Sequence, residues 1–460
     1  MAGPDAGGRR SPFKAYDIRG RVPEDLDSAM AWRIGQALDE ELAPGPVITG
    51  RDVRSSSPVL REALSAGLAG RGRTVIDLGL CGTEEVYFAT SNMGAAGGVM
   101  VTASHNPLGY NGMKLVREDA KPISGDSGLD RIRQKAGVED GRPARLFNGD
   151  VDASWSAGKS AYAEHLLNYV DADKLKPLKI VANAGNGTAG LAIDALAPHL
   201  PFEFVCIQHE PDPSFPHGIP NPLLPEMRQA TVDAVRDSGA DIGLAWDGDF
   251  DRCFFFDADG RFIEGYYVVG LLAEAMLQVS PGGKVIHDPR LVWNTIEKVT
   301  NAGGIPVESK TGHAFIKERM RREDAIYGGE MSAHHYFRDF AYCDSGMIPW
   351  LLIASLISTR GTGLADMVDE AMERYPCSGE LNFMVNDPQW AIQAICDQYQ
   401  ERDPQISQID GLSADFGEWR YNLRISNTEP LLRLNIETRG NAGLLEDRIN
   451  EISEILVALA

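Results

Sequence analysis

Short apolar runs alternate with amphipathic segments along most of this chain, and this alternation narrows the possible folds more than any other pattern. Residues 27–42 carry apolar side chains at helical spacing, and the apolar run VITG follows at 47–50. Apolar run, glycine-containing loop and helical pattern succeed one another again from residue 179 and from residue 258. Regular alternation of strand and helix is typical of α/β domains. We therefore predict an α/β chain built from duplicated units.

The chain changes character after residue 375. Strand-like runs at 380–385, 421–425 and 431–437 surround a helical segment at 390–400. A final helical segment carries apolar side chains on one broad face, at Leu444, Leu445, Ile449, Ile452, Ile455, Leu456 and Leu459. We expect this part of the chain to form a small α+β domain.

Charge and cysteine usage exclude several classes of protein. The 460-residue chain has a formal net charge of −22, which disfavours a broad surface for nucleic acid or anionic membrane. No apolar run reaches membrane-spanning length, and the Gly- and Pro-rich start lacks the apolar core of a signal peptide. The six cysteines are scattered without a CxxC pair, which indicates reduced thiols. We therefore expect a soluble cytoplasmic protein that binds neither nucleic acid nor membrane.

The stretch GVMVTASHNPLGYNG, at 98–112, is the first that indicates a functional site. Its apolar start predicts a buried strand that ends at 102–107, where Pro107 forbids further strand pairing. Strand ends at one edge of an α/β sheet are where such proteins bind ligands. Ser104 would lie there beside His105, among backbone N–H groups that can hold phosphate oxygens. The loop alone fits a phosphoryl-carrying serine and a simple helix-capping turn equally well.

A second stretch, DGDFDR at 247–252, follows a buried-looking apolar run. Asp247, Asp249 and Asp251 alternate, so their carboxylates can turn toward one point and offer the hard oxygen ligands that Mg²⁺ prefers. The alternative is a solvated acidic turn, but three acids packed this closely repel one another without a cation. Because the loop follows a buried strand, we favour the metal. Arg252 would then lie beside the ion and bind a phosphate oxygen.

Two further loops are weaker signals on their own. In YGGEMSAHH at 327–335, Glu330 and Ser332 suit the recognition of sugar hydroxyls, although a turn with exposed polar residues explains them as well. The tandem histidines raise a metal site, but no third ligand is evident nearby. In RISNTEP at 424–430, Arg424 and the short polar residues after it can form an anion cradle, yet such turns are common without that role.

With these four segments in this order, the chain resembles the α-D-phosphohexomutase superfamily, closest to its bacterial phosphomannomutase/phosphoglucomutase members. TASHNP at 102–107 is similar to the family's phosphoserine loop, and DGDFDR at 247–252 is similar to its metal loop. GEMSAH at 329–334 is similar to the sugar-binding loop, and RISNTEP at 424–430 is similar to the phosphate-binding loop. The resemblance spans the chain from Ala15 to the C-terminal helix.

This resemblance implies three related α/β domains and a C-terminal α+β domain arranged around a central active-site cleft. The expected domains are 1–154 with the phosphoserine loop, 155–257 with the metal loop, 258–375 with the sugar loop and 376–460 with the phosphate loop. The implied catalytic residues are Ser104, Arg19, Lys114 and His313. The implied Mg²⁺ ligands are Ser104, as phosphoserine, with Asp247, Asp249 and Asp251. The implied substrate contacts are Tyr16, Arg252, Gly312, Glu330, Ser332, His334, Arg424, Ser426, Asn427 and Thr428.

The implied reaction is the reversible interconversion of hexose 1-phosphate and hexose 6-phosphate through a phosphoserine enzyme and a hexose 1,6-bisphosphate. The implied cofactors are Mg²⁺ and, as activator, glucose 1,6-bisphosphate or mannose 1,6-bisphosphate. The enzyme would be a monomer or a weak homodimer. The Glu-Met-Ser form of the sugar loop favours mannose and glucose phosphates. The alternatives are a phosphoglucosamine mutase, a metal-dependent sugar-phosphate phosphohydrolase and a non-catalytic sugar-phosphate sensor. Phe250 departs from the family's usual Gly, and we expect its side chain to turn away from the aspartates.

Overall fold

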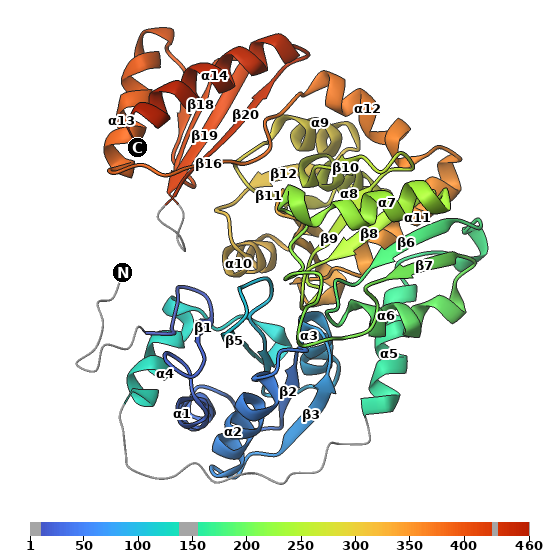
Figure 1. Ribbon diagram of the computed structural model, residues 1–460, viewed down its shortest axis with the longest axis vertical. Coiled ribbons are helices and arrows are strands. Elements are labelled where there is room, and N and C mark those ends of the chain that lie inside the picture. Colours follow the sequence, from blue (N-terminus) through green and yellow to red (C-terminus); the bar gives the residue numbers. More distant parts are fainter. Residues whose placement is uncertain (1–10, 138–154, 426–430, 460) are drawn as a thin grey trace. The chain divides into compact units, whose positions relative to one another are not determined.

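The computed structural model describes residues 11–137, 155–425 and 431–459. These residues fall into two compact units, the first made of Met1–Phe262 with His334–Gly361 and the second of Ile263–Ala333 with Thr362–Ala460. Strands and helices alternate through most of the first unit and through the first part of the second, as the apolar pattern predicts (Figure 1).

The first sheet of the first unit has the strand order β1-β5-β4-β2-β3. Its strands are β1 (Ile18–Arg21), β2 (Val47–Arg51), β3 (Val75–Leu80), β4 (Gly97–Val101) and β5 (Tyr110–Arg117). β2 runs parallel to β3 and β4, whereas β5 is antiparallel to β1 and β4. The apolar pattern does not predict β5, because polar residues interrupt its sequence YNGMKLVR.

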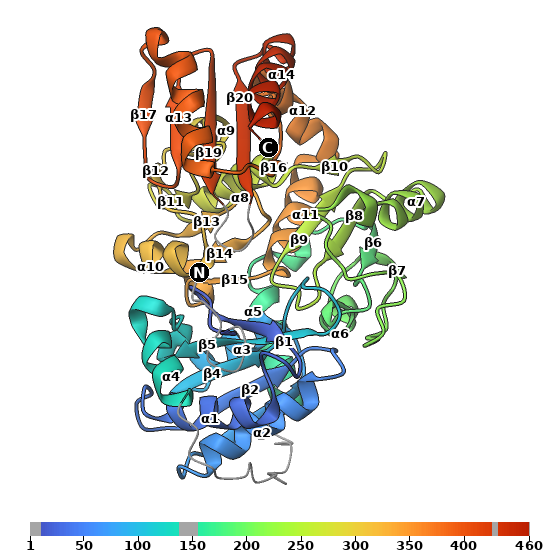
Figure 2. The ribbon, with the colours of Figure 1, turned by 60° about the vertical axis from the view of Figure 1, so that its left-hand side comes forward.

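Helices cover both faces of this sheet (Figure 2). α1 (Ser28–Asp39), α2 (Ser57–Ala69) and α4 (Leu129–Ala136) share one apolar core with the sheet. α3 (Thr83–Asn92) packs on the opposite face, since a Cβ at Gly98 would meet α3 while one at its neighbour Gly97 would meet Leu42. The N-terminus of α3 contacts the acidic loop at 247–251, because Thr83 N donates to Asp249 O at 3.1 Å.

The second sheet of this unit runs in the order β9-β8-β6-β7. The strands that follow β5 are β6 (Lys179–Asn183), β7 (Glu203–Ile207), β8 (Ile242–Trp246), β9 (Cys253–Phe256) and the short β10 (Phe262–Ile263). The helices are α5 (Trp155–Leu167), α6 (Ala189–Leu196), α7 (Gln229–Ser238) and α11 (Ile348–Arg360). β6 pairs in parallel with β7 and β8, and β8 pairs antiparallel with β9. The hairpin β14 (His335–Phe337) and β15 (Cys343–Asp344) also belongs to this unit.

The second unit begins with three parallel strands. These are β11 (Lys284–His287), β12 (Ile305–Glu308) and β13 (Tyr327–Gly329), and β11 lies between the other two. Their helices are α8 (Gly265–Val279), α9 (Trp293–Asn301), α10 (His313–Glu323) and α12 (Leu364–Arg374). The alternation of helical and strand-like segments that the sequence predicts from residue 258 is present in this part of the structure.

The C-terminal part of the second unit is an antiparallel sheet in the order β16-β20-β19-β18-β17. Its strands are β16 (Leu381–Phe383), β17 (Gln405–Ser407), β18 (Leu412–Asp415), β19 (Trp419–Ile425) and β20 (Leu432–Thr438). α13 (Pro388–Tyr399) and α14 (Ala442–Ala458) share one apolar core with these strands. This is the small α+β domain that the sequence predicts.

Among the described residues, no single helix is both long and apolar enough to cross a membrane. The successive helices α11 and α12 reach the required length and composition only when taken as a pair.

A buried carboxylate joins the parallel strands of the second unit to its C-terminal sheet. Glu437 on β20 is 0% exposed and accepts hydrogen bonds from Val292 N at 2.7 Å, Arg420 Nη1 at 2.9 Å and Tyr266 Oη. Arg420 on β19 also donates to the carbonyls of Arg290 and Pro289, both at 2.9 Å. Glu437 and Arg420 therefore fix the loop between β11 and α9.

Replacing Glu437 by Gln should strongly destabilise the protein. The change leaves Arg420 as a buried charge without its counter-ion, a loss that costs about 3–5 kcal/mol in the free energy of unfolding. Urea denaturation of the wild type and of Glu437→Gln measures the difference. Glu297→Gln is the matched control, since Glu297 pairs with a half-exposed Arg374 and should change stability by less than about 1 kcal/mol. Equal losses in the two variants would contradict the prediction.

Candidate active site

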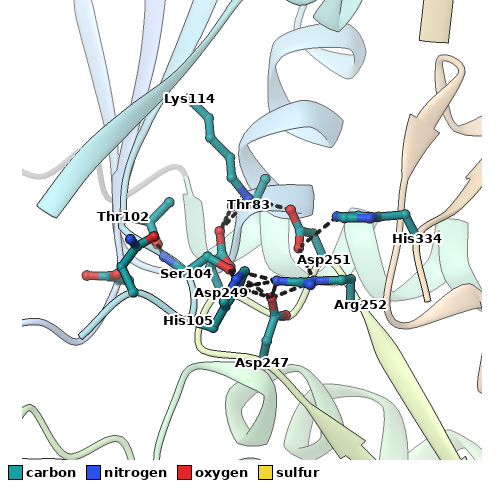
Figure 3. A network of polar contacts seen from close by, with 12 residues as sticks. Thr83, Thr102, Ser104, His105, Lys114, Asp247, Asp249, Asp251, Arg252 and His334 are labelled. Carbon is teal, nitrogen blue, oxygen red and sulfur yellow. Dashed lines mark hydrogen bonds and ion pairs between the residues drawn. The ribbon is translucent and has the colours of Figure 1, made fainter. Parts of the chain in front are cut away.

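Ser104 lies at the end of β4 on a sharply turned loop (Figure 3). Its φ of +49° is a left-handed value that non-glycine residues rarely adopt, and its backbone N–H donates to Thr102 Oγ1 at 2.9 Å. The Ser104 hydroxyl donates to Asp247 Oδ2 at 2.8 Å and lies 3.0 Å from His105 Nδ1. Ser104 is only 2% exposed. The turn thus aims the hydroxyl at the acidic loop.

The three alternating aspartates follow β8 and converge as the sequence predicts. Asp247, Asp249 and Asp251 are buried, and each offers an oxygen within 4.8 Å of the others. The Oδ1 atom of each has no hydrogen-bond partner. Three buried carboxylates that converge in this way, each with one oxygen left without a hydrogen bond, fit a hard divalent cation such as Mg²⁺. The donor set therefore suits the expected metal.

Two close approaches shape the acidic loop. Phe250 has a φ of +44° and is fully buried, and its ring lies where a Cβ on Gly82 would come within 2.0 Å of it. Phe250 thus packs on the start of α3 while the aspartate oxygens on either side of it converge. A Cβ on Gly248 would lie 2.8 Å from Ser104 O, so glycine at 248 permits the serine loop and the acidic loop to touch.

Basic side chains surround the carboxylates. Lys114 on β5 contacts Asp249 Oδ2 at 2.7 Å and also Asp251. Burial alone would lower the pKa of Lys114, but the charges of these two aspartates raise it. Arg252 Nε donates to Asp247 Oδ2 at 2.9 Å, and its Nη2 lies 3.3 Å from Ser104 Oγ. Burial would raise the pKa of Asp247, but the charge of Arg252 together with the interactions of His105 and Lys114 lowers it.

Thr83 is a member of this network that the sequence analysis misses. Its hydroxyl donates to Asp249 Oδ2 at 2.5 Å from the first residue of α3. The neighbouring Glu84 is fully buried and accepts from Tyr162 Oη at 2.6 Å, Ser345 Oγ at 2.9 Å and Gly346 N at 2.6 Å. These bonds fix the start of α3 beside the acidic loop. A Thr-Glu-Glu helix start carries no chemical signal of its own, so only the fold identifies Thr83.

Arg19 and Tyr16 lie at the start of the first unit. Arg19 Nε donates to Asp17 Oδ2 and its Nη1 donates to Asn106 Oδ1, both at 2.7 Å. The second of these bonds places Arg19 on the serine loop. Tyr16 is half-buried, just before β1.

His334 corrects one expectation. The sequence shows no third metal ligand near the tandem histidines, but the structure brings His334, Asp251 and Asp344 to within 4.8 Å of one another. His334 Nε2 lies 3.8 Å from Asp251 Oδ1. Asp344 comes from β15 and Asp251 from the acidic loop, which is why the local sequence does not reveal these two groups.

The second unit holds the predicted sugar-binding residues. Glu330 Oε1 accepts from Gly312 N at 2.9 Å, so the two predicted positions are in direct contact. Ser332 Oγ lies 3.3 Å from Arg290 Nη2. His313 begins α10 and is half-buried.

Asp288 and Arg290, which the sequence analysis misses, organise this loop. Asp288 Oδ2 accepts from Arg290 Nη2 at 2.7 Å and from Met331 N at 2.9 Å. The signal that could have found them is a charged pair immediately after the buried strand β11, where ligand-binding residues of α/β sheets lie.

Arg424 closes β19 and is part of a cationic cluster. Its Nη2 donates to Glu380 Oε2 at 2.8 Å, and Arg433 Nη1 lies 3.1 Å from Glu380 Oε1. The remaining members of the predicted phosphate cradle, Ser426, Asn427 and Thr428, lie outside the described residues.

Four family models match successive parts of this chain. They describe the phosphoglucomutase/phosphomannomutase alpha/beta/alpha domain I over residues 10–140, domain II over 160–260 and domain III over 264–375, and the C-terminal domain over 380–455. These matches confirm the expected α/β fold with three related domains and a distinct C-terminal domain.

Relatives match over nearly the full length. The chain is 64% identical over 447 residues to a protein named "Phosphohexose mutases" from Xanthomonas campestris pv. campestris, covering 96% of this chain and 98% of the relative. It is 53% identical over 449 residues to a phosphomannomutase of Escherichia coli K12, with the same coverage. A crystal structure of a phosphoglucomutase/phosphomannomutase family protein from Burkholderia thailandensis aligns with a TM-score of 0.83 at 30% identity, over 97% of both chains.

The four family models and the relatives agree on one family. The chain belongs to the phosphoglucomutase/phosphomannomutase family and is a phosphohexomutase, an isomerase that transfers phosphate within its sugar substrate.

Proposed function

We propose that Ser104 carries the phosphoryl group by which this phosphohexomutase interconverts hexose 1-phosphate and hexose 6-phosphate. The observation that carries the proposal is the 2.8 Å hydrogen bond from Ser104 Oγ to Asp247 Oδ2 inside a buried acidic triad. Phosphoserine donates its phosphoryl to O6 or O1 of the bound sugar, and the bisphosphate returns its other phosphoryl to Ser104. The Ser104 oxygen–phosphorus bond breaks as the sugar oxygen–phosphorus bond forms, and the hydroxyl proton leaves to a base.

Asp247, Asp249 and Asp251, with a phosphoserine oxygen, would hold Mg²⁺. Bound there, the ion neutralises phosphate charge and makes the phosphorus a better electrophile. Arg252 is placed to bind a phosphoryl oxygen, since its Nη2 lies 3.3 Å from Ser104 Oγ. Arg19, tied to the serine loop through Asn106, adds a second positive charge. Lys114 and His313 are the candidates for moving the hydroxyl proton.

We propose that the second unit supplies the sugar contacts. Glu330 and Ser332 bind neighbouring sugar hydroxyls, and Gly312 holds the Glu330 carboxylate by its backbone N–H. Arg424, with Ser426, Asn427 and Thr428, binds the distal phosphate. Tyr16 and His334 complete the substrate contacts. Glucose 1,6-bisphosphate or mannose 1,6-bisphosphate acts as activator, because it phosphorylates a free Ser104.

We expect the enzyme to accept both mannose and glucose phosphates. The two sugars differ only at O2, so a carboxylate that binds O3 and O4 does not distinguish them. Coupled assays with mannose 1-phosphate, glucose 1-phosphate and glucosamine 1-phosphate, each with Mg²⁺ and bisphosphate, measure the preference. We expect kcat/KM for glucosamine 1-phosphate to be lower by about tenfold or more, the effect of about 1.4 kcal/mol. A higher value for glucosamine 1-phosphate, or phosphate release without isomer formation, would overturn the proposal.

We further propose domain boundaries near residues 154, 257 and 375, a monomer or weak homodimer, and activity in the cytoplasm. The location is supported by six free cysteines, of which Cys81, Cys253 and Cys343 are buried.

A further inference from the structure

The guanidinium group of Arg54 contacts the backbone of the whole serine loop. Arg54 Nη2 donates to the carbonyls of Ser104 at 2.9 Å and Asn106 at 2.5 Å. Arg54 Nη1 donates to the carbonyls of Pro107 at 3.0 Å and Tyr110 at 3.1 Å. Both terminal nitrogens are therefore engaged by carbonyls from one stretch of seven residues, 104–110, and Arg54 is only 3% exposed.

Arg54 is itself held rigidly by the loop between β2 and α2. Asp52 Oδ1 accepts from Arg54 N at 3.0 Å, and Asp52 Oδ2 lies 3.5 Å from Arg54 Nε. Ser57 Oγ, at the start of α2, donates to the same Asp52 Oδ1 at 2.5 Å and accepts from Asn111 Nδ2 at 2.9 Å. The far end of the serine loop is thereby tied to the same helix.

The serine loop needs such support. Ser104 has a left-handed φ of +49°, which a serine keeps only when surrounding contacts over-determine it. Arg54 binds the carbonyl oxygen of Ser104. The same oxygen is closely approached by Gly248 of the acidic loop, where an added Cβ would lie 2.8 Å from it. A shift of this carbonyl would turn the Ser104 hydroxyl relative to Asp247.

We propose that Arg54 is a positioning residue for phosphoryl transfer, which aims Ser104 Oγ by binding four carbonyls of its loop. The inference rests on the proposed phosphoserine role of Ser104. In-line transfer depends on geometry, and a displacement of about 1 Å can reduce a rate by about 100-fold. A lysine keeps the charge at this position but cannot reproduce the planar fork that reaches four carbonyls.

Arg73 provides a matched control in the same unit. Its guanidinium also pairs with one carboxylate, Asp39, and binds four carbonyls, those of Asp39, Leu42, Ala43 and Gly45. These carbonyls belong to the end of α1 and the turn after it, away from the serine loop. A loss of general stability should therefore follow from either arginine, and a loss of phosphoryl transfer only from Arg54.

The test compares Arg54→Lys, Arg54→Ala, Arg73→Lys and Arg73→Ala in the full-length enzyme. We expect kcat to fall about 100-fold in Arg54→Lys, with KM for hexose 1-phosphate nearly unchanged and the enzyme folded by circular dichroism. Guanidinium chloride, added well below denaturing concentration, should restore part of kcat in Arg54→Ala and none in Ser104→Ala. The Arg73 variants should keep the wild-type kcat per folded molecule.

Three other outcomes would contradict the positioning role of Arg54. Wild-type kcat in Arg54→Lys, an equal loss in the Arg73 variants, or the absence of guanidinium rescue in folded Arg54→Ala would overturn the inference. Intact-mass analysis after incubation with glucose 1,6-bisphosphate distinguishes a failure of the phosphoserine proposal from a failure of the Arg54 role. If the wild type itself acquires no phosphate, the phosphoserine proposal fails. If the wild type is phosphorylated normally and the Arg54 variants transfer at full rate, only the Arg54 role fails.

Discussion

Ser104→Ala should lower kcat by about four orders of magnitude or more, because it removes the hydroxyl that we propose to carry the phosphoryl group. In the part of the chain that the structure describes, Ser104 Oγ is the hydroxyl that donates to Asp247, whereas the hydroxyl of Thr83 donates to Asp249. A coupled assay with hexose 1-phosphate, Mg²⁺ and bisphosphate measures kcat. Titration calorimetry should show that the variant still binds the sugar phosphate, since the proposed sugar contacts of the second unit are untouched.

Ser65→Ala is the matched control for this prediction. Ser65 is as deeply buried as Ser104 but lies on α2, so its loss should leave kcat unchanged. Near wild-type turnover by Ser104→Ala would contradict the phosphoserine role. So would radiolabel from the bisphosphate that stays covalently bound to the variant.

Asp249→Asn should lower activity by about 100- to 1000-fold, which corresponds to the several kcal/mol that a catalytic cation contributes. Asp249 offers one of the three unpartnered carboxylate oxygens of the triad, and an amide oxygen carries no charge to hold the ion. Removing divalent cations with a chelator should abolish wild-type activity, and added Mg²⁺ should restore it. The variant should need a higher Mg²⁺ concentration for half-maximal rate.

Asp257→Asn controls for the loss of a buried carboxylate as such. Asp257 is 1% exposed in the same unit, but it serves the turn after β9 by accepting from Arg261 Nε at 2.8 Å. Its replacement should leave the Mg²⁺ requirement unchanged. Full activity of the wild type in the presence of the chelator would contradict the proposed role of the metal.

The sequence predicts those features of this molecule that depend on residues close to one another in the chain. Asp247, Asp249 and Asp251 lie within five residues, so their convergence follows from alternation along one loop. The family and the order of its four domains follow from four short motifs, and both are confirmed. The roles of the individual site residues stay predictions for the experiments above.

Contacts that depend on tertiary structure could not be predicted in the same way. Lys114 reaches Asp249 and Asp251 because β5 pairs antiparallel with β4, which sets Lys114 opposite Met100. Thr83 and Arg54 lie on a helix and a loop that are distant in sequence from the groups to which they donate hydrogen bonds. Their residue types are common, and only the folded chain distinguishes them from ordinary surface threonines and arginines.

The contact between Gly82 and Phe250 couples two positions that are distant in the sequence. The ring occupies the volume that any side chain at 82 would need, so a mutation at either site changes what the other tolerates. A residue larger than glycine at 82 therefore requires a smaller side chain or a displaced ring at 250. Grafting the acidic loop with Phe250 into a relative therefore requires glycine at the position that corresponds to Gly82.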